Sequence, residues 1–278
     1  MYRIKFSDRC LVLKAPQVMG ILNVTPDSFS DGGKYGQLDA ALRQAEAMVA
    51  AGATFIDIGG ESTRPGADAV SVDQELVRVI PVIEAVKANL DVLVSLDTSK
   101  AEVISQGISA GADLINDVRA LQAPGALQAV AASRVPVCLM HMQGEPRTMQ
   151  DTPQYGDLIS DIRHFFEDRI DECVNAGIER SRILIDPGFG FGKSGDHNYQ
   201  LLNQLDQFHE LDRPLLVGLS RKSMIGQVLN NDISERVIGS VAGAVIAAMK
   251  GCHIVRVHDV KETVEAMNIV RATLQESV

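Results

Sequence analysis

The sequence predicts an α/β protein with a single-domain (β/α)8 TIM barrel fold, from three observations. Eight short runs rich in Val, Ile and Leu alternate with segments of helical periodicity. The runs show little polar alternation, which is typical of parallel strands buried on both faces. The chain has 278 residues, and such barrels usually have about 250 residues. A doubly wound open sheet is the alternative, but the count of eight favours the barrel, and no dinucleotide-binding glycine pattern follows the first run.

The predicted strands and helices alternate as βαβ units require. We expect strands at residues 17–24, 54–60, 91–98, 113–118, 135–142, 182–188, 213–220 and 253–260. Apolar residues spaced i, i+3, i+4 and i+7 predict helices over 38–49, 76–86 and 155–176. Further helices are expected over 100–110, 124–133, 197–211, 221–230, 234–250 and 261–275.

The first fifteen residues precede these elements and are expected to form a short β-hairpin that closes the bottom of the barrel. No linker, internal repeat or low-complexity segment divides the sequence. We therefore expect one barrel domain over residues 1–278.

The composition argues against several classes of function. The chain is 46% hydrophobic and 22% charged with a net charge of −10, so we expect no general basic surface for nucleic acid. The N-terminus lacks a long apolar segment, and the longest apolar run, 241–249, is too short to span a bilayer. The four cysteines form no C-x-x-C pair, which is typical of reduced thiols. We expect a cytoplasmic protein that binds neither nucleic acid nor membrane.

The stretch DPGFGFGKS at residues 186–194 has the glycines of a nucleotide-binding loop but not their spacing. A P-loop would have glycine where Pro187 stands, and proline has no N–H to donate. The glycines at 188, 190 and 192 also fail the G-x-G-x-x-G pattern. We therefore expect this stretch to serve another purpose.

Polar side chains end most of the predicted strands, and the active sites of such barrels lie at the carboxyl ends of the strands. Asp97, Asn116 and Asp186, with Lys222 beside them, form one set. A carboxylate can accept two parallel N–H bonds from an amidine-like edge. This set therefore suits a flat, nitrogen-rich ring.

A second set of polar residues consists of Asn23, Arg256, His258 and Arg64. Arg256 and His258 are two positions apart in a strand, so they share one face. Guanidinium and imidazole groups of this kind suit an anion such as phosphate.

Each of these residues also has a purely structural interpretation. Asp186 could begin a turn, and Asp97 could cap the following helix. Arg256 and His258 could form ion pairs at the rim, and His141 could be a packed core histidine. Polar groups nevertheless end six strands, which chance burial in a barrel does not favour.

Six motifs resemble those of the dihydropteroate synthase family, and the similarity runs from about residue 16 to 275. They are GILNVTPDSFSDGG at 20–33, DIGGESTRPGA at 57–67, LINDV at 114–118, IDPGFGFGK at 185–193, LVGLSRKSMIG at 216–226 and VRVHDVKETVEAM at 255–267. The resemblance implies a transferase of folate biosynthesis, the target of sulfonamides. Such an enzyme joins 4-aminobenzoate to 6-hydroxymethyl-7,8-dihydropterin diphosphate and releases diphosphate and 7,8-dihydropteroate.

The resemblance also implies roles for the pterin-side residues. Asp186 is expected to accept from the amidine edge of the pterin, and Asn116 and Asp97 to bond the other ring nitrogens. Lys222 is expected to donate to the pterin carbonyl and a ring nitrogen. Arg256 is expected to lie over the pterin face.

For the other half of the site, Arg256, His258 and Asn23 are expected to reach the diphosphate. Asn23 is the expected ligand of Mg²⁺, the implied cofactor, with Asp31 near it. The residues expected to build the aminobenzoate pocket are Thr63, Arg64, Pro65, Phe29 and Phe189.

The implied mechanism needs no covalent nucleophile. The diphosphate leaves first, helped by Mg²⁺ and the positive cluster. Asp97 and Asp186 can stabilise the delocalised pterin cation, and the neutral aryl amine then attacks. Asp97, Lys222 and Asp31 are the expected catalytic residues.

Two other functions remain open on the sequence. One is a methyltransferase that takes a methyl group from methyltetrahydrofolate on a barrel of the same type, and the loops around Asn23 and Arg64 argue against it. The other is a non-catalytic pterin-binding protein, and the presence of Asn23, Arg256 and His258 argues against it. The resemblance also implies a homodimer formed through late helices, and residues 241–249 are a candidate surface for it.

Overall fold

The computed structural model describes residues 2–6, 8–25, 33–62, 69–144, 149 and 153–276, and these residues form the expected (β/α)8 barrel. Eight strands lie in the order β8-β7-β6-β5-β4-β3-β10-β9, and the paired strands are parallel. A parallel bridge between Ile185 and Leu215 closes the sheet between β8 and β9. The strands are β3 (Gln17–Asn23), β4 (Phe55–Gly59), β5 (Leu93–Asp97), β6 (Leu114–Asp117), β7 (Val137–Met140), β8 (Ile183–Asp186), β9 (Leu216–Val217) and β10 (Ile254–Val257).

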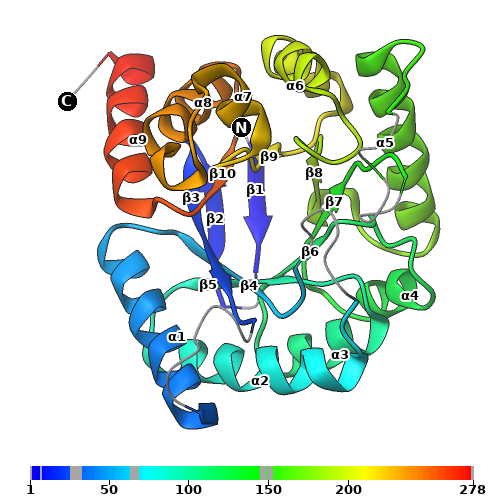
Figure 1. Ribbon diagram of the computed structural model, residues 1–278. Helices are drawn as coiled ribbons and strands as arrows, with labels where there is room; N and C mark the ends of the chain where they lie inside the picture. Colours follow the sequence, from blue (N-terminus) through cyan, green and yellow to red (C-terminus); the bar gives the residue numbers. More distant parts are fainter. Residues whose placement is uncertain are drawn as a thin grey trace.

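Helices surround these strands on the outside (Figure 1). They are α1 (Gly33–Ala50), α2 (Val72–Asn89), α3 (Ala101–Ser109), α4 (Ala126–Ala131), α5 (Leu158–Asn175), α6 (Gly195–Asn203), α7 (Ser223–Leu229), α8 (Val237–Met249) and α9 (Val260–Gln275). Among the described residues, no helix is long and apolar enough to cross a membrane.

The segment expected as one helix over 197–211 is divided into two pieces. α6 ends at Asn203, and the 3-10 helix η3 (Leu205–Leu211) follows it. Leu205 and Phe208 are buried and three residues apart, and a 3-10 helix aligns residues at that spacing on one face. Similarly, α8 begins only after the short 3-10 helix η4 (Ile233–Glu235).

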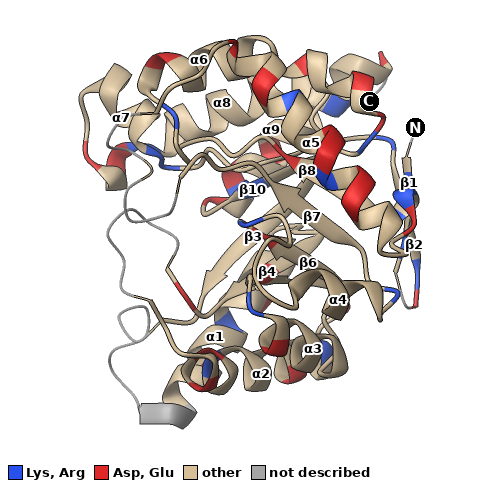
Figure 2. Cartoon of the chain, turned by 90° about the vertical axis from the view of Figure 1, so that its right-hand side faces the viewer, with Lys and Arg blue, Asp and Glu red and all other residues tan. Residues whose placement is uncertain are grey.

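The N-terminal hairpin pairs β1 (Tyr2–Lys5) with β2 (Cys10–Leu13) in antiparallel register, as expected. Ile4, Phe6 and Leu13 are buried against apolar side chains from the amino-terminal halves of the barrel strands. Figure 2 shows the hairpin at one end of the barrel. The contacted barrel residues are Met19, Phe55, Leu93, Leu114, Cys138, Leu184, Leu216 and Ile254. The hairpin therefore covers the bottom of the barrel and leaves the carboxyl ends of the strands for a site.

Candidate active site

The barrel interior changes from apolar to polar along the strands. Two positions above the apolar layer at the bottom, β4, β5, β6, β8 and β10 carry the polar side chains of Asp57, Ser95, Asn116, Asp186 and Arg256, as the two-residue period of a strand allows. Asp97 on β5 is paired in register with Asn116 on β6, and Asp186 lies opposite Met140 on β7. Asp97, Asn116 and Asp186 are 8%, 4% and 5% exposed. The structure thus brings these three predicted residues to the carboxyl-terminal half of the barrel.

Arg256 is the central cation of this interior. Its Nε lies 2.6 Å from Asp57 Oδ2, and its Nη2 lies 2.7 Å from Asp97 Oδ2. Asp57 also accepts from Ser95 Oγ at 2.5 Å and from Asn116 Nδ2 at 3.3 Å. A buried guanidinium needs such partners, and these bonds fix its plane beside Asp97.

Burial shifts the pKa values of Asp97 and Asp186 upwards. Burial raises the pKa of Asp97 to about 7; the Arg256 guanidinium opposes this rise, and the carboxylates of Asp57 and Glu75 add to it. Burial also raises the pKa of Asp186, while Lys222 and the Gly188 N–H bond lower it. Perturbed pKa values of this kind are enriched at functional sites.

Lys222 approaches the same region from the residue before α7. Burial lowers its pKa to about 8, although the charge of Asp186 acts in the opposite direction. Its Nζ donates to the carbonyl of Phe189 and lies 4.7 Å from the centre of the Phe191 ring. A cation over an aromatic face is an attractive contact, and it places the ammonium between the loop after β8 and the barrel interior.

The glycine-rich stretch after β8 forms a tight loop for which left-handed backbone is needed. Gly188 has φ of 73° and Gly192 has φ of 62°. A Cβ atom on Gly188 would lie 1.9 Å from the carbonyl oxygen of His141, and one on Gly192 would lie 2.3 Å from that of Gln143. The glycines are therefore required because this loop packs directly on the backbone that follows β7.

Phe189 and Phe191 point into different environments. The Phe189 side chain is fully buried in the main hydrophobic core, so its ring does not line an open pocket in this structure. Phe191 packs with Val118 and Met140 next to Lys222. The expected contact of Phe189 with aminobenzoate stays a prediction.

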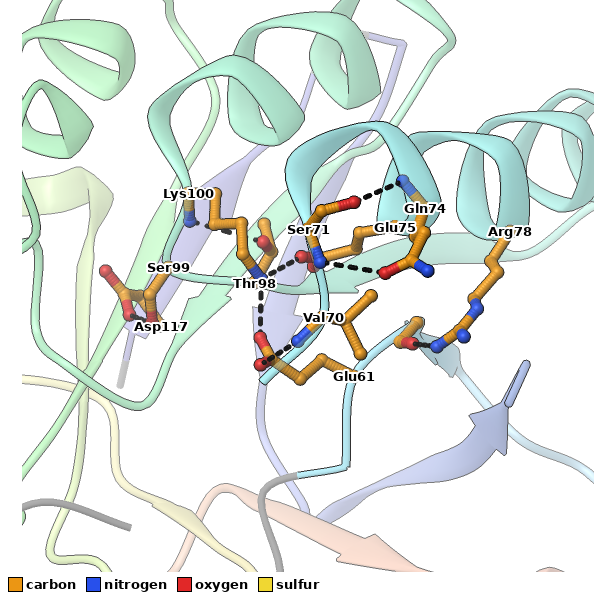
Figure 3. A network of polar contacts seen from close by, with 11 residues as sticks. Glu61, Val70, Ser71, Gln74, Glu75, Arg78, Thr98, Ser99, Lys100 and Asp117 are labelled. Carbon is orange, nitrogen blue, oxygen red and sulfur yellow. Dashed lines mark hydrogen bonds and ion pairs between the residues drawn. The ribbon is translucent and has the colours of Figure 1, made fainter. Parts of the chain in front are cut away.

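A polar network lies beside the exits of β4 and β5 (Figure 3). Lys100 bonds Glu61 at 2.5 Å and also bonds Glu75, which is fully buried. Glu61 Oε1 accepts from the N–H of Val70 at 3.0 Å. These bonds connect Glu61 and Val70, which flank residues 62–69, to Glu75 on α2 and to Lys100, the residue before α3. A cavity of about 630 Å³ adjoins the network and includes Asp97 in its lining.

Of the residues predicted to bind an anion, Asn23, Arg256 and His258 lie in the described part of the chain. Asn23 is the last residue of β3 and is half-buried. The His258 backbone N–H donates to Ser220 Oγ at 3.2 Å, and its Nδ1 lies 3.1 Å from the same oxygen. The remaining predicted residues lie outside the described part of the chain: Phe29, Asp31, Thr63, Arg64 and Pro65.

Some residues of this interior were not predicted from the sequence. Asp57 is fully buried and bonds Ser95, Asn116 and Arg256. The sequence carries a signal for it, since an acidic residue inside the apolar run 54–60 must have a partner. Lys193 is also buried, and its position at the end of the glycine-rich stretch gave no comparable signal.

Comparison with known proteins assigns the family. The "Pterin binding enzyme" family matches residues 19–258. The dihydropteroate synthase of Escherichia coli strain K12 is 60% identical over 264 residues, which is 95% of this chain and 94% of the relative. The chain belongs to the dihydropteroate synthase family. This membership confirms the expected family and the expected transferase activity.

Solved dihydropteroate synthases have the same fold. A structure from Yersinia pestis, described as a complex with a sulfonamide drug, superposes with a TM-score of 0.94 and 61% identity, covering 98% of this chain and 99% of that one. The enzyme from Xanthomonas albilineans with 4-aminobenzoic acid gives a TM-score of 0.92 and 49% identity, with 98% of both chains covered. The barrel prediction is confirmed at this level too.

Proposed function

We propose that this dihydropteroate synthase binds its pterin substrate among Asp97, Asn116, Asp186 and Lys222 and joins it to 4-aminobenzoate there. The observation that carries the assignment is the cluster of buried carboxylates and an amide around Arg256, next to the Lys222 ammonium. A dihydropterin diphosphate offers an amidine edge, ring nitrogens and a carbonyl. Its donors suit the carboxylates, and its acceptors suit Lys222 and the amide of Asn116.

In the proposed reaction the bond from the pterin methylene carbon to the diphosphate oxygen breaks first. The electron pair leaves with the diphosphate, and a cation delocalised over the pterin remains. Ionised Asp97 and Asp186 stabilise that cation, because fixed charges in a water-poor interior act strongly on developing charge. The nitrogen of 4-aminobenzoate then bonds to the methylene carbon and loses a proton.

Arg256 and His258 are proposed to hold the departing diphosphate with Asn23. Arg256 is preorganised for this role by its bonds to Asp57 and Asp97. A preorganised guanidinium recognises phosphate oxygens well.

Mg²⁺ fits this donor set as an ion that enters with the diphosphate. The described residues contain no group of three His, Cys, Asp or Glu side chains placed to hold a metal ion, and Asn23 offers a single amide oxygen. Mg²⁺ often binds through one or two protein ligands together with substrate phosphates and water. When bound, it would neutralise charge on the leaving group. Asp31, which is expected near Asn23 as a catalytic residue, lies outside the described residues.

The test is an assay of diphosphate release from dihydropterin diphosphate with 4-aminobenzoate and Mg²⁺. We expect release that depends on both substrates, that stops when the metal is chelated and that returns when Mg²⁺ is added back. A methyltransferase would instead transfer a methyl group from methyltetrahydrofolate, and a binding protein would release no diphosphate. Either of those results would overturn the proposal.

The pterin-side roles are tested by Lys222→Met. The substitution keeps the length of the side chain but removes its charged donors, and each hydrogen bond to a charged group contributes about 1.5–3 kcal/mol. We expect the pterin substrate to bind about tenfold to a hundredfold more weakly, measured by calorimetry on folded protein. Wild-type affinity and turnover in this variant would contradict the assignment.

We also propose a homodimer that uses α8. Ile238, Ile246 and Met249 on this helix are 82%, 47% and 51% exposed, and Val228 on neighbouring α7 is 67% exposed. Contiguous apolar surface of this kind commonly marks an interface between subunits. Ile238→Asp should convert the dimer to monomer in sedimentation velocity, whereas a wild-type protein that sediments as a monomer would remove the proposal.

The proposed location is the cytoplasm. All four cysteines are free, and Cys138, Cys173 and Cys252 are buried. Unpaired thiols are typical of a reducing compartment. Fractionation of the source cells with an antibody against the protein tests this location.

A further inference from the structure

Lys193 is 2% exposed and stands at the end of the glycine-rich loop after β8. Its Nζ lies 3.0 Å from His141 Nδ1, 2.9 Å from the Gly188 carbonyl oxygen and 3.1 Å from the Phe191 carbonyl oxygen. Among the described residues, no carboxylate lies within ion-pair distance of it. An ammonium has three N–H donors and no acceptor, so the three acceptors match its donors one for one.

This pattern also fixes the protonation state of His141. Burial lowers the pKa of Lys193 to about 7, so below that pH the amine is charged and can only donate. Nδ1 of His141 is then the unprotonated nitrogen, and the proton of the neutral ring lies on Nε2. Burial lowers the pKa of His141 to about 2, and the charge of Lys193 lowers it further. The hydrogen-bond geometry and the lowered pKa therefore both indicate that the His141 ring is neutral and accepts a hydrogen bond from Lys193.

Besides a backbone bond from the Phe191 N–H to the Gly188 carbonyl at 3.1 Å, the loop is held by hydrogen bonds with side chains. Tyr155 Oη donates to the Gly192 carbonyl at 2.7 Å, and Asn198 Oδ1 accepts from the Gly190 N–H at 2.7 Å. Lys193 reaches two further carbonyls from inside the loop. It thereby joins the loop to the end of β7, where His141 stands.

The same loop is bonded directly to two residues of the proposed pterin site. The Gly188 N–H donates to Asp186 Oδ1 at 2.8 Å. The Phe189 carbonyl accepts from Lys222 Nζ. A displacement of residues 188–191 would therefore move a partner of Asp186 and a partner of Lys222 together.

We propose that the Lys193 ammonium is a positioning residue for pterin binding, an internal cation that holds loop 187–193 against β7 and so orients Asp186 and Lys222. The inference rests on the proposed function, since it takes Asp186 and Lys222 as pterin ligands. Lys193 also contributes charge, because it is among the groups that lower the pKa of Asp186 against the effect of burial. It does not touch the substrate in this assignment.

The test is Lys193→Met, which has a similar length and no donors. We expect the dissociation constant for dihydropterin diphosphate to rise about tenfold or more, which is the effect of losing at least one charge-assisted hydrogen bond. Inorganic diphosphate, with Mg²⁺, should bind within about twofold of wild type, because Arg256 lies on β10 and His258 directly follows it, so neither belongs to the loop after β8. Both constants are measured by calorimetry at a temperature where the variant is folded. A merely structural role would leave the pterin constant unchanged in folded protein.

A pair of His141 variants tests the same contact without removing the lysine. His141→Asn keeps an acceptor near the position of Nδ1, whereas His141→Leu has none. We expect near-wild-type pterin affinity for the first and a loss of about tenfold for the second. Equal affinities for the pair would overturn the inference even where Lys193→Met does not fold.

Two further variants complete the design. Lys87→Met removes a lysine that bonds Asp113 at 2.9 Å, at the start of β6 and far from the loop, and it should reduce stability without changing pterin affinity. Asp186→Asn separates the two proposals. Weak binding by Asp186→Asn with wild-type binding by Lys193→Met would overturn the positioning role alone. Wild-type binding by both variants would overturn the pterin site and the positioning role together.

Discussion

Asp97 lies in an unusual electrostatic environment for a proposed catalytic carboxylate. It is buried, it bonds Arg256, and the carboxylates of Asp57, Glu75 and Asp117 all raise its pKa. A pKa of about 7 means that the carboxyl is partly protonated at neutral pH. Since only the ionised form can stabilise a pterin cation, this residue should limit activity on the acid side.

The first prediction concerns the pH profile of kcat/KM for the pterin substrate. Asp97 must be ionised, so the rate should fall below a pKa of about 7, and Lys222 must be charged, so it should fall above a pKa of about 8. The two limbs together make the profile bell-shaped, and kcat/KM reports the pKa values of these groups in the free enzyme. Glu75→Gln removes a charge that raises the Asp97 pKa and should move the acid limb to lower pH.

Glu61→Gln is the matched control for Glu75→Gln. Both glutamates bond Lys100, but Glu61 has a side chain that is 30% exposed, whereas that of Glu75 is fully buried. Water screens the charge of the exposed residue more strongly. The acid limb should therefore stay in place in Glu61→Gln, and an equal displacement in both variants would contradict the electrostatic account.

At the residue scale, the sequence predicted the ends of the strands better than their interiors. Asp97, Asn116 and Asp186 could be chosen because each ends an apolar run. Asp57 lies inside an apolar run, so its own burial could be predicted, but its partner Arg256 could not, because the two residues are 199 positions apart and bond only when the barrel closes. Long-range pairing of this kind leaves no local pattern.

At the element scale, the loop after β8 shows what its glycines do. Gly188 combines a left-handed backbone with direct packing on the His141 carbonyl. Gly177, after α5, also has positive φ, 95°, but a Cβ atom there would meet no atom within 4 Å. A side chain at position 177 would meet only the strain of a left-handed backbone, whereas one at position 188 would also clash with a neighbouring backbone.

The second prediction compares Gly188→Ala with Gly177→Ala. At position 177 only the left-handed conformation is penalised, at about 1–2 kcal/mol. At position 188 the added methyl must also displace the backbone next to His141, so we expect a larger loss of unfolding free energy and a loss of pterin affinity. Urea titration and calorimetry give the two quantities. Equal stability losses would show that the loop can move away from β7 without cost.

The strands and helices themselves were predicted closely because buried parallel strands and amphipathic helices leave strong local patterns. Each of the eight predicted runs contains one observed strand. The errors are at boundaries, as in the division of 197–211 between α6 and η3. The i, i+3 spacing of Leu205 and Phe208 fits both an α-helix and a 3-10 helix, so it could not decide between them.

At the scale of the whole molecule, buried ionisable groups couple folding to pH in opposite directions. His141 and Lys193 have lowered pKa values, whereas Asp97 has a raised one. The folded protein therefore resists the uptake of a proton at His141. It takes up a proton at Asp97 more readily than the unfolded chain does. The net acid stability is the sum of these effects, so a difference between two variants isolates one group more cleanly than a single curve does.

The third prediction isolates His141. The unfolded chain protonates this residue near its ordinary pKa of about 6.5, whereas burial keeps it neutral in the folded state down to a pH of about 2. Below the unfolded pKa, the unfolded state thus binds one more proton, and the unfolding free energy falls as the pH falls. His141→Asn has no such proton. From pH of about 5.5 to about 4, the free energy of wild type minus that of the variant should fall by about 1.4 kcal/mol per pH unit.

Urea titrations at several pH values measure this difference, using variants that share one m value. The contributions of Asp97 and Asp186 are common to both proteins and cancel. Lys193 remains charged throughout this range, because its folded pKa is about 7, so its bond to the side chain at position 141 does not change with pH in either protein. A difference that stays constant from pH of about 5.5 to about 4 would mean that folded His141 accepts a proton after all. In that case Nδ1 could not be the acceptor for Lys193, and the internal cation would lose one of its three partners.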